Sequence, residues 1–317
     1  MTGLVTRASP QTLRILALAL ALLATVLFFA TQIEGYLSPR MFTRISTSAA
    51  VVLPIAVGQA IVIMTRNIDL SAGSVMGVTA YMTGQLLNTM PDLHPVLAVL
   101  FCMALGAAFG ALNGIIIAFG RVPSIIVTLG TLALYRSFLV EWSDAKTITT
   151  ASLPQWLVDL PSANAVTIAG IDIRVTVLLA LAACLVTGLA LTFYRPARRF
   201  YAVGSNPDAA VMAGINARRV VLTAFILSGA FAGLGFELKA IAAVVVGGVS
   251  IMGGSGSMIG VLIGALLVDT IDNSLTRWAV VNEFWRDALL GGLIMAAVTL
   301  DTFASRQLTK LRKGGQQ

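Results

Sequence analysis

Polar side chains able to bind a small polar molecule are concentrated in one segment, Asn67 to Ser74, which lies between two apolar stretches. It combines an amide, a carboxylate, two hydroxyls and a glycine. An ionisable group at the centre of a membrane costs roughly 3 kcal/mol, so such a cluster usually faces a cavity, a partner or the interface. We therefore predict that a polar pathway is lined by Asn67, Asp69, Ser71, Gly73 and Ser74. The alternative is that Asp69 and Ser71 only cap the helix that follows.

A second segment repeats part of this pattern later in the chain. Residues 253–260 read GGSGSMIG and residues 73–77 read GSVMG, so both carry G-S-x-x-G at the start of an apolar stretch. Membrane transporters often contain internal repeats, although small residues four apart are also common on helix-packing surfaces. We extend the predicted pathway to Gly253, Gly254 and Ser255. Three later residues either line the same path or lie at the membrane interface: Asp269, Asp272 and Asn273.

Motifs for catalysis are absent from the sequence. It contains no G-x-x-x-x-G-K-[ST] segment for phosphate binding, no His and Cys cluster with metal-ligand spacing and no G-x-S-x-G turn. Cys102 and Cys184 fall inside apolar stretches, which favours buried, unpaired thiols. The sequence thus predicts no catalytic residue, no metal and no cofactor, and any ATP hydrolysis is expected from a separate subunit.

The composition indicates an all-α, polytopic membrane protein. Hydrophobic residues make up 57% of the 317 residues, charged residues 11%, and the mean hydropathy is +0.90. Apolar runs near twenty residues recur along the chain, each long enough to cross a hydrocarbon core of roughly 30 Å. The net charge of +7 lies in loops and in the tail, so membrane orientation explains it better than binding to nucleic acid.

We expect about ten transmembrane helices in a single transmembrane domain, residues 1–317. The first is an uncleaved anchor, and the third runs from the polar segment to about residue 87. The expected range of the first helix is 15–30. The second and the fourth to tenth are expected, in chain order, at 49–64, 95–119, 123–140, 175–193, 220–234, 240–246, 258–271 and 284–300.

The orientation follows from the loop charges. Short loops rich in Arg and Lys stay in the cytoplasm, and the loop 194–219 carries five arginines against one aspartate. The connection 141–174 is net negative and contains two tryptophans, which suits the outer face. Both termini are therefore expected inside, with 301–317 as a basic cytoplasmic tail. Within the basic loop, residues 206–214 have a helix-start signal at one end and glycine at the other, which predicts a short helix.

The stretch 220–246 does not fit two full crossings. Residues 220–234 reach only about 22 Å as a helix, and they run straight into Glu237 and Lys239 before the next apolar run. Two crossings would share almost no turn, whereas one long helix would place both charges deep in lipid.

Four segments together resemble the membrane permease of bacterial ABC importers for monosaccharides, a family with ribose, xylose, rhamnose and autoinducer-2 importers. They are residues 63–77 (IMTRNIDLSAGSVMG), 127–136 (VTLGTLALYR), 198–216 (RRFYAVGSNPDAAVMAGIN) and 235–260 (GFELKAIAAVVVGGVSIMGGSGSMIG). The wording of TRNID and GTLALYR is most similar to the rhamnose and autoinducer-2 branch. The resemblance covers nearly the whole chain, with the motifs in the family's order.

This resemblance implies a permease in the bacterial inner membrane. Its partners would be a second permease in a homodimer or heterodimer, cytoplasmic ABC ATPase subunits, an extracytoplasmic sugar-binding protein and membrane lipid. The basic loop 194–219 matches the family's ATPase-docking segment. The docking residues that it implies are Arg198, Gly204, Asn206, Asp208, Ala209, Ala210, Gly214 and Ile215.

One departure from the family concerns residue 235, where relatives carry about one further helix-sized segment. Two alternatives to the importer reading therefore stay open. One is a secondary carrier driven by an ion gradient, with Asp69 or Asp269 as the coupling carboxylate. The other is a paralogue that cannot transport because this segment is missing.

Overall fold

The computed structural model describes residues 10–234 and 239–278, with isolated positions between 285 and 299. Six helices in the described ranges are long and apolar enough to cross a membrane. They are α1 (Pro10–Gln32), α2 (Pro39–Met64), α4 (Pro95–Gly120), α5 (Ser124–Ser143), α7 (Val175–Phe193) and α12 (Met258–Arg277).

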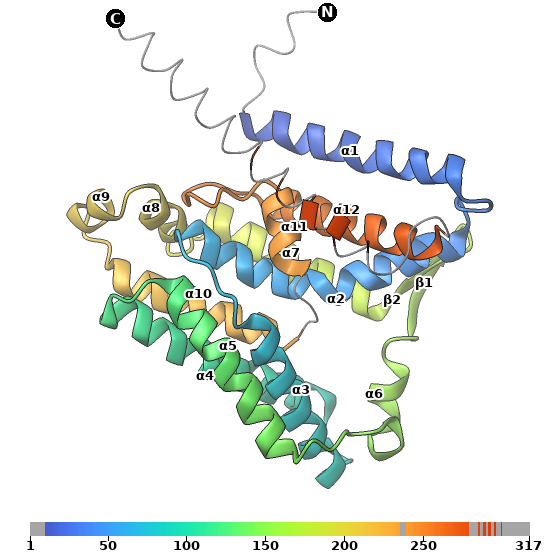
Figure 1. The fold of residues 1–317 in the computed structure, drawn as a ribbon, viewed down its shortest axis with the longest axis horizontal. Coiled ribbons are helices and arrows are strands. Elements are labelled where there is room, and N and C mark those ends of the chain that lie inside the picture. The colour runs from blue at the N-terminus through green and yellow to red at the C-terminus, as the bar shows by residue number, and fades with distance from the viewer. Residues whose placement is uncertain are drawn as a thin grey trace, which may run out of the picture.

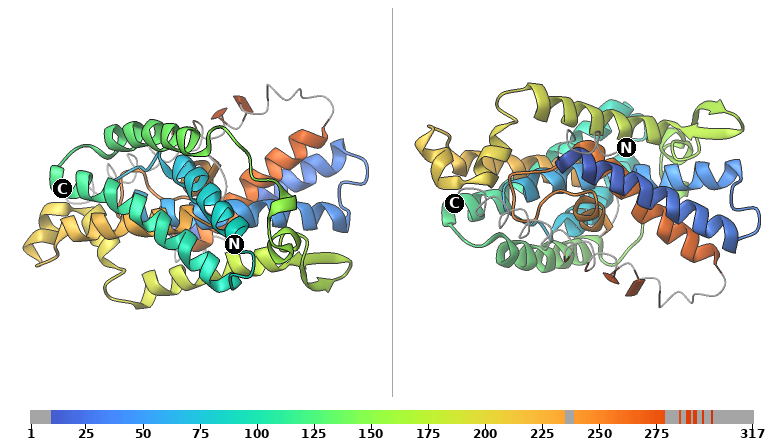
Figure 2. Two further views of the ribbon diagram at one scale, coloured as in Figure 1. Left: turned by 90° about the horizontal axis from the view of Figure 1, so that it is seen from below. Right: turned by 90° about the horizontal axis from the view of Figure 1, so that it is seen from above.

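Shorter elements connect these helices. They are α3 (Ala72–Thr89), a 3-10 turn (Thr150–Ser152), α6 (Gln155–Asp159), the antiparallel strands β1 (Asn164–Ile168) and β2 (Ile171–Arg174), α8 (Arg199–Ser205), α9 (Pro207–Met212), α10 (Ala217–Ala232) and α11 (Lys239–Val246). Figure 1 shows α8 and α9 at one end of the helices and the β1–β2 hairpin with α6 at the other, and Figure 2 agrees. The predicted basic and acidic loops thus lie at opposite ends.

Helix α2 is the centre of the fold. It packs against α7, α10, α11, α12 and β2, and its C-terminal half is buried residue after residue from Leu53 to Met64. A helix that is apolar on all sides is stable when other helices surround it. The other membrane-length helices, except α12, are mostly exposed on the chain, as expected for surfaces that meet lipid or a partner.

Glycines bring α4 and α10 into backbone contact. A Cβ added at Gly110 would lie 2.1 Å from the carbonyl oxygen of Phe225, and one added at Gly229 would lie 2.1 Å from that of Gly106. Since apolar burial does not drive helices together inside lipid, close packing at small residues does so instead. This contact therefore fixes the position of α10, which is only 16 residues long.

The structure corrects several expected boundaries. Helix α2 starts at Pro39, not near residue 49, because proline is favoured in the first turn and the polar residues after it still allow a helix. Helix α12 continues to Arg277, beyond the predicted end at 271. The connection 141–174 contains a helix and a hairpin that the sequence analysis missed. The predicted helix 284–300, the tail 301–317 and Glu237 lie outside the described ranges.

The short seventh and eighth helices are confirmed. Helix α10 has 16 residues and α11 has 8, which gives about 24 Å and 12 Å of helix. Neither reaches across a hydrocarbon core of roughly 30 Å. The expected count of ten full crossings is therefore not met by the described part of the chain.

We expect Gly110→Ala to destabilise the protein, because its Cβ would push α10 away from α4. Overpacking of this kind costs about 1–3 kcal/mol. The control is Gly130→Ala on α5, where an added Cβ has no atom within 4 Å. Thermal unfolding of the detergent-solubilised proteins measures both variants; equal midpoints for the two would contradict the close contact.

Candidate functional site

A buried carboxylate organises the break between α2 and α3. One oxygen of Asp69, Oδ1, accepts hydrogen bonds from the backbone N–H of Ser71 at 3.0 Å and from its hydroxyl at 2.6 Å. The other oxygen accepts from the hydroxyl of Ser228 on α10 at 3.1 Å. Asp69 is only 2% exposed, and these donors compensate for the water that its carboxylate has lost.

The hydrogen bonds continue from Ser71 and Asp69 into three more helices. The Asn113 amide of α4 donates to the Ser71 hydroxyl at 2.7 Å, and the Tyr135 hydroxyl of α5 donates to the Asn113 carbonyl oxygen at 3.2 Å. The Gln59 amide of α2 donates to the backbone carbonyl of Asp69 at 2.9 Å. We call these residues the Asp69 network: Gln59, Asp69, Ser71, Asn113, Tyr135 and Ser228. Every member is buried. The hydrogen bonds of the network connect α2, α3, α4, α5 and α10.

The predicted pathway residues of this segment thus divide into two groups. Asp69 and Ser71 are buried within the chain, whereas Asn67, Gly73 and Ser74 are half-buried. Ser71 makes no side-chain capping hydrogen bond to α3, so the capping alternative is wrong for Ser71. A lining role for the segment during transport stays a prediction.

The cytoplasmic-loop segment forms two short helices, of which the sequence predicted the second. Asn206 caps α9 by accepting a hydrogen bond from the backbone N–H of Ala209 at 3.0 Å, and Pro207 occupies the first turn. Gly214, with φ of 77°, follows the helix end. Helix α8 was missed because its seven residues are too few for an apolar periodicity to be recognised.

An exposed apolar residue on α9 was also missed. Met212 is 92% exposed, and its neighbour Val211 is exposed as well. The signal was the apolar pair itself, at the end of the predicted short helix. Exposed apolar side chains on a polar loop often mark a contact with another protein.

Three chain segments meet at Gly204, the penultimate residue of α8. A Cβ added at Gly204 would lie 1.7 Å from the carbonyl oxygen of Met64 and 2.5 Å from the backbone nitrogen of Gly254. The N–H of Gly254 donates to that same Met64 carbonyl at 2.9 Å. The predicted docking residue Gly204 and the predicted pathway glycines Gly253 and Gly254 are therefore neighbours.

Arg66 holds this contact from the end of α2. Its guanidinium donates to the backbone carbonyls of Gly204 and Ser205, the latter at 2.6 Å. These carbonyls end α8, where the helix dipole favours a positive charge. Arg66 has a left-handed backbone with φ of 64°, which turns the chain from α2 toward Asn67. No local signal in the sequence points to this contact.

The glycine-rich loop after α11 adopts conformations that need glycine. Gly253 and Gly254 have φ of 78° and 73°, a region that disfavours residues with a Cβ. Ser255 is exposed. Within the described ranges, no hydrogen bond joins these three residues to the Asp69 network. Gly253 lies against the backbone of Arg66, which precedes Asn67, and a shared pathway stays a prediction.

A second buried polar group lies between α2, α11 and α12. Lys239 forms an ion pair with Asp272 at 2.7 Å, and the hydroxyl of Ser48 donates to Asp269 at 2.8 Å. Both aspartates and Asn273 are buried within the chain, and their lining role and their interface position both stay predictions. The ion pair explains how Lys239 is accommodated among apolar helices.

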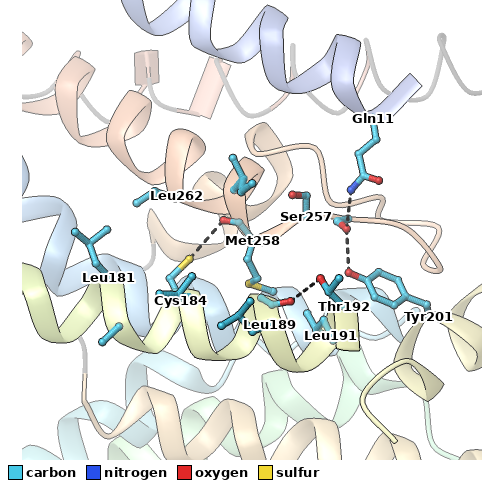
Figure 3. A pocket seen from close by; sticks show the side chains of 15 residues that line it. Gln11, Leu181, Cys184, Leu189, Leu191, Thr192, Tyr201, Ser257, Met258 and Leu262 are labelled. Carbon is cyan, nitrogen blue, oxygen red and sulfur yellow. Dashed lines mark hydrogen bonds between the residues drawn. The ribbon is translucent and has the colours of Figure 1, made fainter. Parts of the chain in front are cut away.

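An apolar cavity of about 650 Å³ lies between α7 and the start of α12 (Figure 3). At its polar end, the Tyr201 hydroxyl and the Gln11 amide both donate to the Gly256 carbonyl, at 3.0 and 3.1 Å. Burial raises the pKa of Tyr201, so its phenol stays a neutral donor. None of the predicted pathway residues lines this cavity.

Long apolar helices around a buried polar break, with a helix pair held at one end, define a polytopic membrane protein. Comparison with known families agrees. Residues 41–298 match the family described as branched-chain amino acid transport system / permease component, and the chain belongs to this family. It is the permease component of an ABC importer, a multi-pass protein of the bacterial inner membrane.

Similar proteins are named "Autoinducer 2 import system permease protein LsrC". That of Escherichia coli K12 / DH10B is 35% identical over 302 residues, covering 89% of this chain and 85% of the relative. Those of Enterobacter sp. 638 and Salmonella typhi are 34% and 35% identical over 315 and 300 residues, covering 94% and 89% of this chain and 89% and 84% of the relatives. No solved structure matches.

The alignment lengths also show that this chain is gapped against its relatives. The Escherichia coli alignment has 302 positions but includes 89% of the 317 residues, about 282, so about 20 positions face a gap in this chain. Twenty residues is the length of one membrane-crossing helix. These lengths give the total of the gap positions, and the deficit expected near residue 235 stays a prediction.

We expect the Asp69 network to act as a unit. Asn113→Ala and Tyr135→Phe each remove one end of a buried hydrogen bond, so each lowers the free energy of unfolding by about 1–3 kcal/mol. The double variant should lose less than the sum of the two, with a coupling energy of about 0.5–3 kcal/mol. Chemical unfolding in detergent measures the cycle, and strict additivity would contradict a shared network.

Proposed function

We propose that this permease imports a small, sugar-like molecule, with autoinducer 2 the best-supported cargo and rhamnose the next. The observation that carries the proposal is the 34–35% identity, over most of the chain, to permeases named for autoinducer-2 import. The description of the family names branched-chain amino acids, so family membership alone does not choose the cargo.

The proposed arrangement has both termini in the cytoplasm. The α8–α9 pair then lies on the inner face and the β1–β2 hairpin on the outer face, where an extracytoplasmic binding protein would deliver the cargo. Ten helical segments result when 284–300 is included, although α10 and α11 are each too short to cross alone. The opposite positions of the basic and acidic loops support this orientation.

The ATPase partner is proposed to dock on α8 and α9. Helix α9 presents the exposed side chains of Asp208, Val211 and Met212. The two apolar side chains form an apolar tip next to the Asp208 carboxylate. The buried Ala210 and the left-handed Gly214 hold α9 in place. Movement of this pair would reach α2 through Gly204 and Arg66, because rigid elements in close contact transmit displacement.

Met212→Asp is expected to weaken ATPase binding at least tenfold, since it places a charge at the apolar tip of the docking surface. Met90→Asp is the matched control: Met90 is also exposed, at 56%, but follows α3 at the far end. Binding of the purified ATPase to each variant in nanodiscs, measured by biolayer interferometry, tests this. Equal affinities would place the docking surface elsewhere.

Arg66→Asn is expected to abolish most uptake while leaving ATPase binding unchanged. Asparagine tolerates the left-handed backbone but cannot donate to both carbonyls of α8 in the same way. The control is Arg121→Asn, because Arg121 also follows a helix with a left-handed φ, of 57°. Uptake and ATP hydrolysis in proteoliposomes are measured together; normal uptake in R66N would show that coupling does not pass through Arg66.

The energy source of uptake distinguishes an ABC importer from the two alternatives, an ion-coupled carrier and a transport-defective paralogue. Uptake of labelled cargo in cells should stop when ATP is depleted and should survive collapse of the proton and sodium gradients. The opposite pattern would favour an ion-coupled carrier. Normal assembly without uptake, restored by inserting a helix-sized segment at residue 235, would instead identify a transport-defective paralogue.

A further inference from the structure

The apolar cavity between α7 and α12 opens on the outside of these helices. Its long wall is one face of α7, from Leu181 to Thr192, which corresponds to about 16 Å of helix. Two of its lining residues, Leu185 on α7 and Ile259 on α12, are 62% and 59% exposed. Figure 3 shows Leu181 at one end of the cavity and Tyr201 at the other. The cavity is therefore an elongated groove that can be entered from the surroundings of the chain.

Direct contact between α7 and α12 forms the floor of this groove. A Cβ added at Gly188 would lie 3.2 Å from the Cβ of Met258, and the Cys184 thiol donates to the Met258 carbonyl at 3.5 Å. Both Cys184 and Met258 are buried. The two helices are thus held against each other, so the shape of the groove is fixed by the fold.

The exposed surface next to the groove is suited to lipid. Leu179, Val186 and Phe193 of α7 are 59%, 65% and 73% exposed, and all three are large and apolar. Contacts between membrane helices favour small residues, whereas lipid tails are as apolar as leucine. Among the described residues that line the groove, none is charged. The part of a ligand that lies in the groove is therefore apolar, as an acyl chain is.

One end of the groove lies next to the basic loop 194–219. There, the Tyr201 hydroxyl donates to the Gly256 carbonyl. Arg198 is exposed and has a helical backbone at the start of α8, three residues before Tyr201, and side chains at this spacing lie on the same face of a helix. Within residues 10–234 and 239–278, Arg198 forms no ion pair. Its guanidinium is therefore available to an anion at this end of the groove.

We propose that one acyl chain of an anionic phospholipid occupies the groove and that Arg198 binds the phosphate of its headgroup. The inference takes the cytoplasmic position of the basic loop from the proposed function, and basic pockets between membrane helices at that face bind anionic headgroups. Guanidinium forms strong, paired hydrogen bonds with phosphate oxygens. A volume of about 650 Å³ is within the range of cavities that bind small ligands.

The groove also adjoins the contact between α8 and α2. Gly256 lines the groove, and a Cβ added at Gly256 would lie 2.9 Å from the terminal methyl carbon of Met64. Tyr201, at the same end, precedes Gly204 by three residues. A bound lipid would hold α8 and the glycine-rich loop against α7. We therefore expect the lipid to strengthen the transmission of movement from α8 to α2.

Photolabelling by a lipid with a diazirine in its acyl chain tests the site directly. The complete importer is placed in phosphatidylcholine nanodiscs that contain the same reactive chain on either phosphatidylglycerol or phosphatidylcholine, and labelled peptides are identified by mass spectrometry. We expect phosphatidylglycerol to label residues 181–192 and 258–262 at least fivefold more than phosphatidylcholine does.

Matched variants separate the groove from general contact with lipid. Leu185→Trp fills part of the groove, whereas Val186→Trp places the same ring at an exposed neighbour that does not line it. Arg198→Gln removes the headgroup charge, whereas Arg199→Gln removes the same charge from a residue that lines a different cavity. We expect L185W and R198Q to lower labelling by phosphatidylglycerol at least fivefold and the two controls to change it less than twofold.

Three outcomes would overturn the proposal. Equal labelling by the two lipids in the unmodified chain would show an ordinary lipid-facing surface, and no labelling would show that protein covers the groove. Equal losses in the variants and their controls would show that the groove and Arg198 do not select the lipid. ATP-driven uptake is measured in proteoliposomes of the same lipids, so uptake without selective labelling refutes this site and leaves the proposed function intact.

The effect on coupling is measured with the same variants. We expect ATP hydrolysis stimulated by cargo to be at least threefold faster in nanodiscs with phosphatidylglycerol than in phosphatidylcholine alone. This difference should disappear in L185W and persist in V186W, because only the first variant fills the groove. An unchanged lipid dependence in L185W would contradict a role of this groove in coupling.

Discussion

The approach of Gly204 to the Met64 carbonyl is the contact on which the account of coupling depends. No residue with a side chain fits there, and Arg66 reinforces it by donating to the last carbonyls of α8. Because α2 is the buried centre of the fold, anything that moves the α8–α9 pair meets the middle of the protein directly. The same end of α2 leads, within five residues, into the Asp69 network.

The Asp69 network converts one buried charge into a constraint on five helices. Its carboxylate accepts three hydrogen bonds, and its outer members hold α4 and α5. In an apolar environment, a polar group left without a partner is more costly than in water, so the helices that carry these groups cannot rotate independently. The network thus fixes the rotation of these helices about their axes.

The sequence was sufficient to predict a polytopic membrane protein, the short α10 and α11, and the helix that follows Asn206. Apolar run length and capping residues are local signals, so they can be recognised without the structure. It was not sufficient for partners distant in the chain. Nothing local indicates that Arg66 meets Gly204, or that Lys239 meets Asp272. The start of α2 was missed because its first turns, around Arg40 and Arg44, are polar and give no apolar run. The family resemblance was confirmed by relatives that cover most of the chain.

The central claim is that this chain works as one subunit of an ATP-driven importer. The most direct measurement is to purify a tagged copy from its native membrane and to identify the proteins that accompany it by mass spectrometry. The account predicts recovery of an ATPase with a Walker motif, together with a second permease subunit. Recovery of this chain alone, from a preparation in which a control importer complex stays intact, would contradict it.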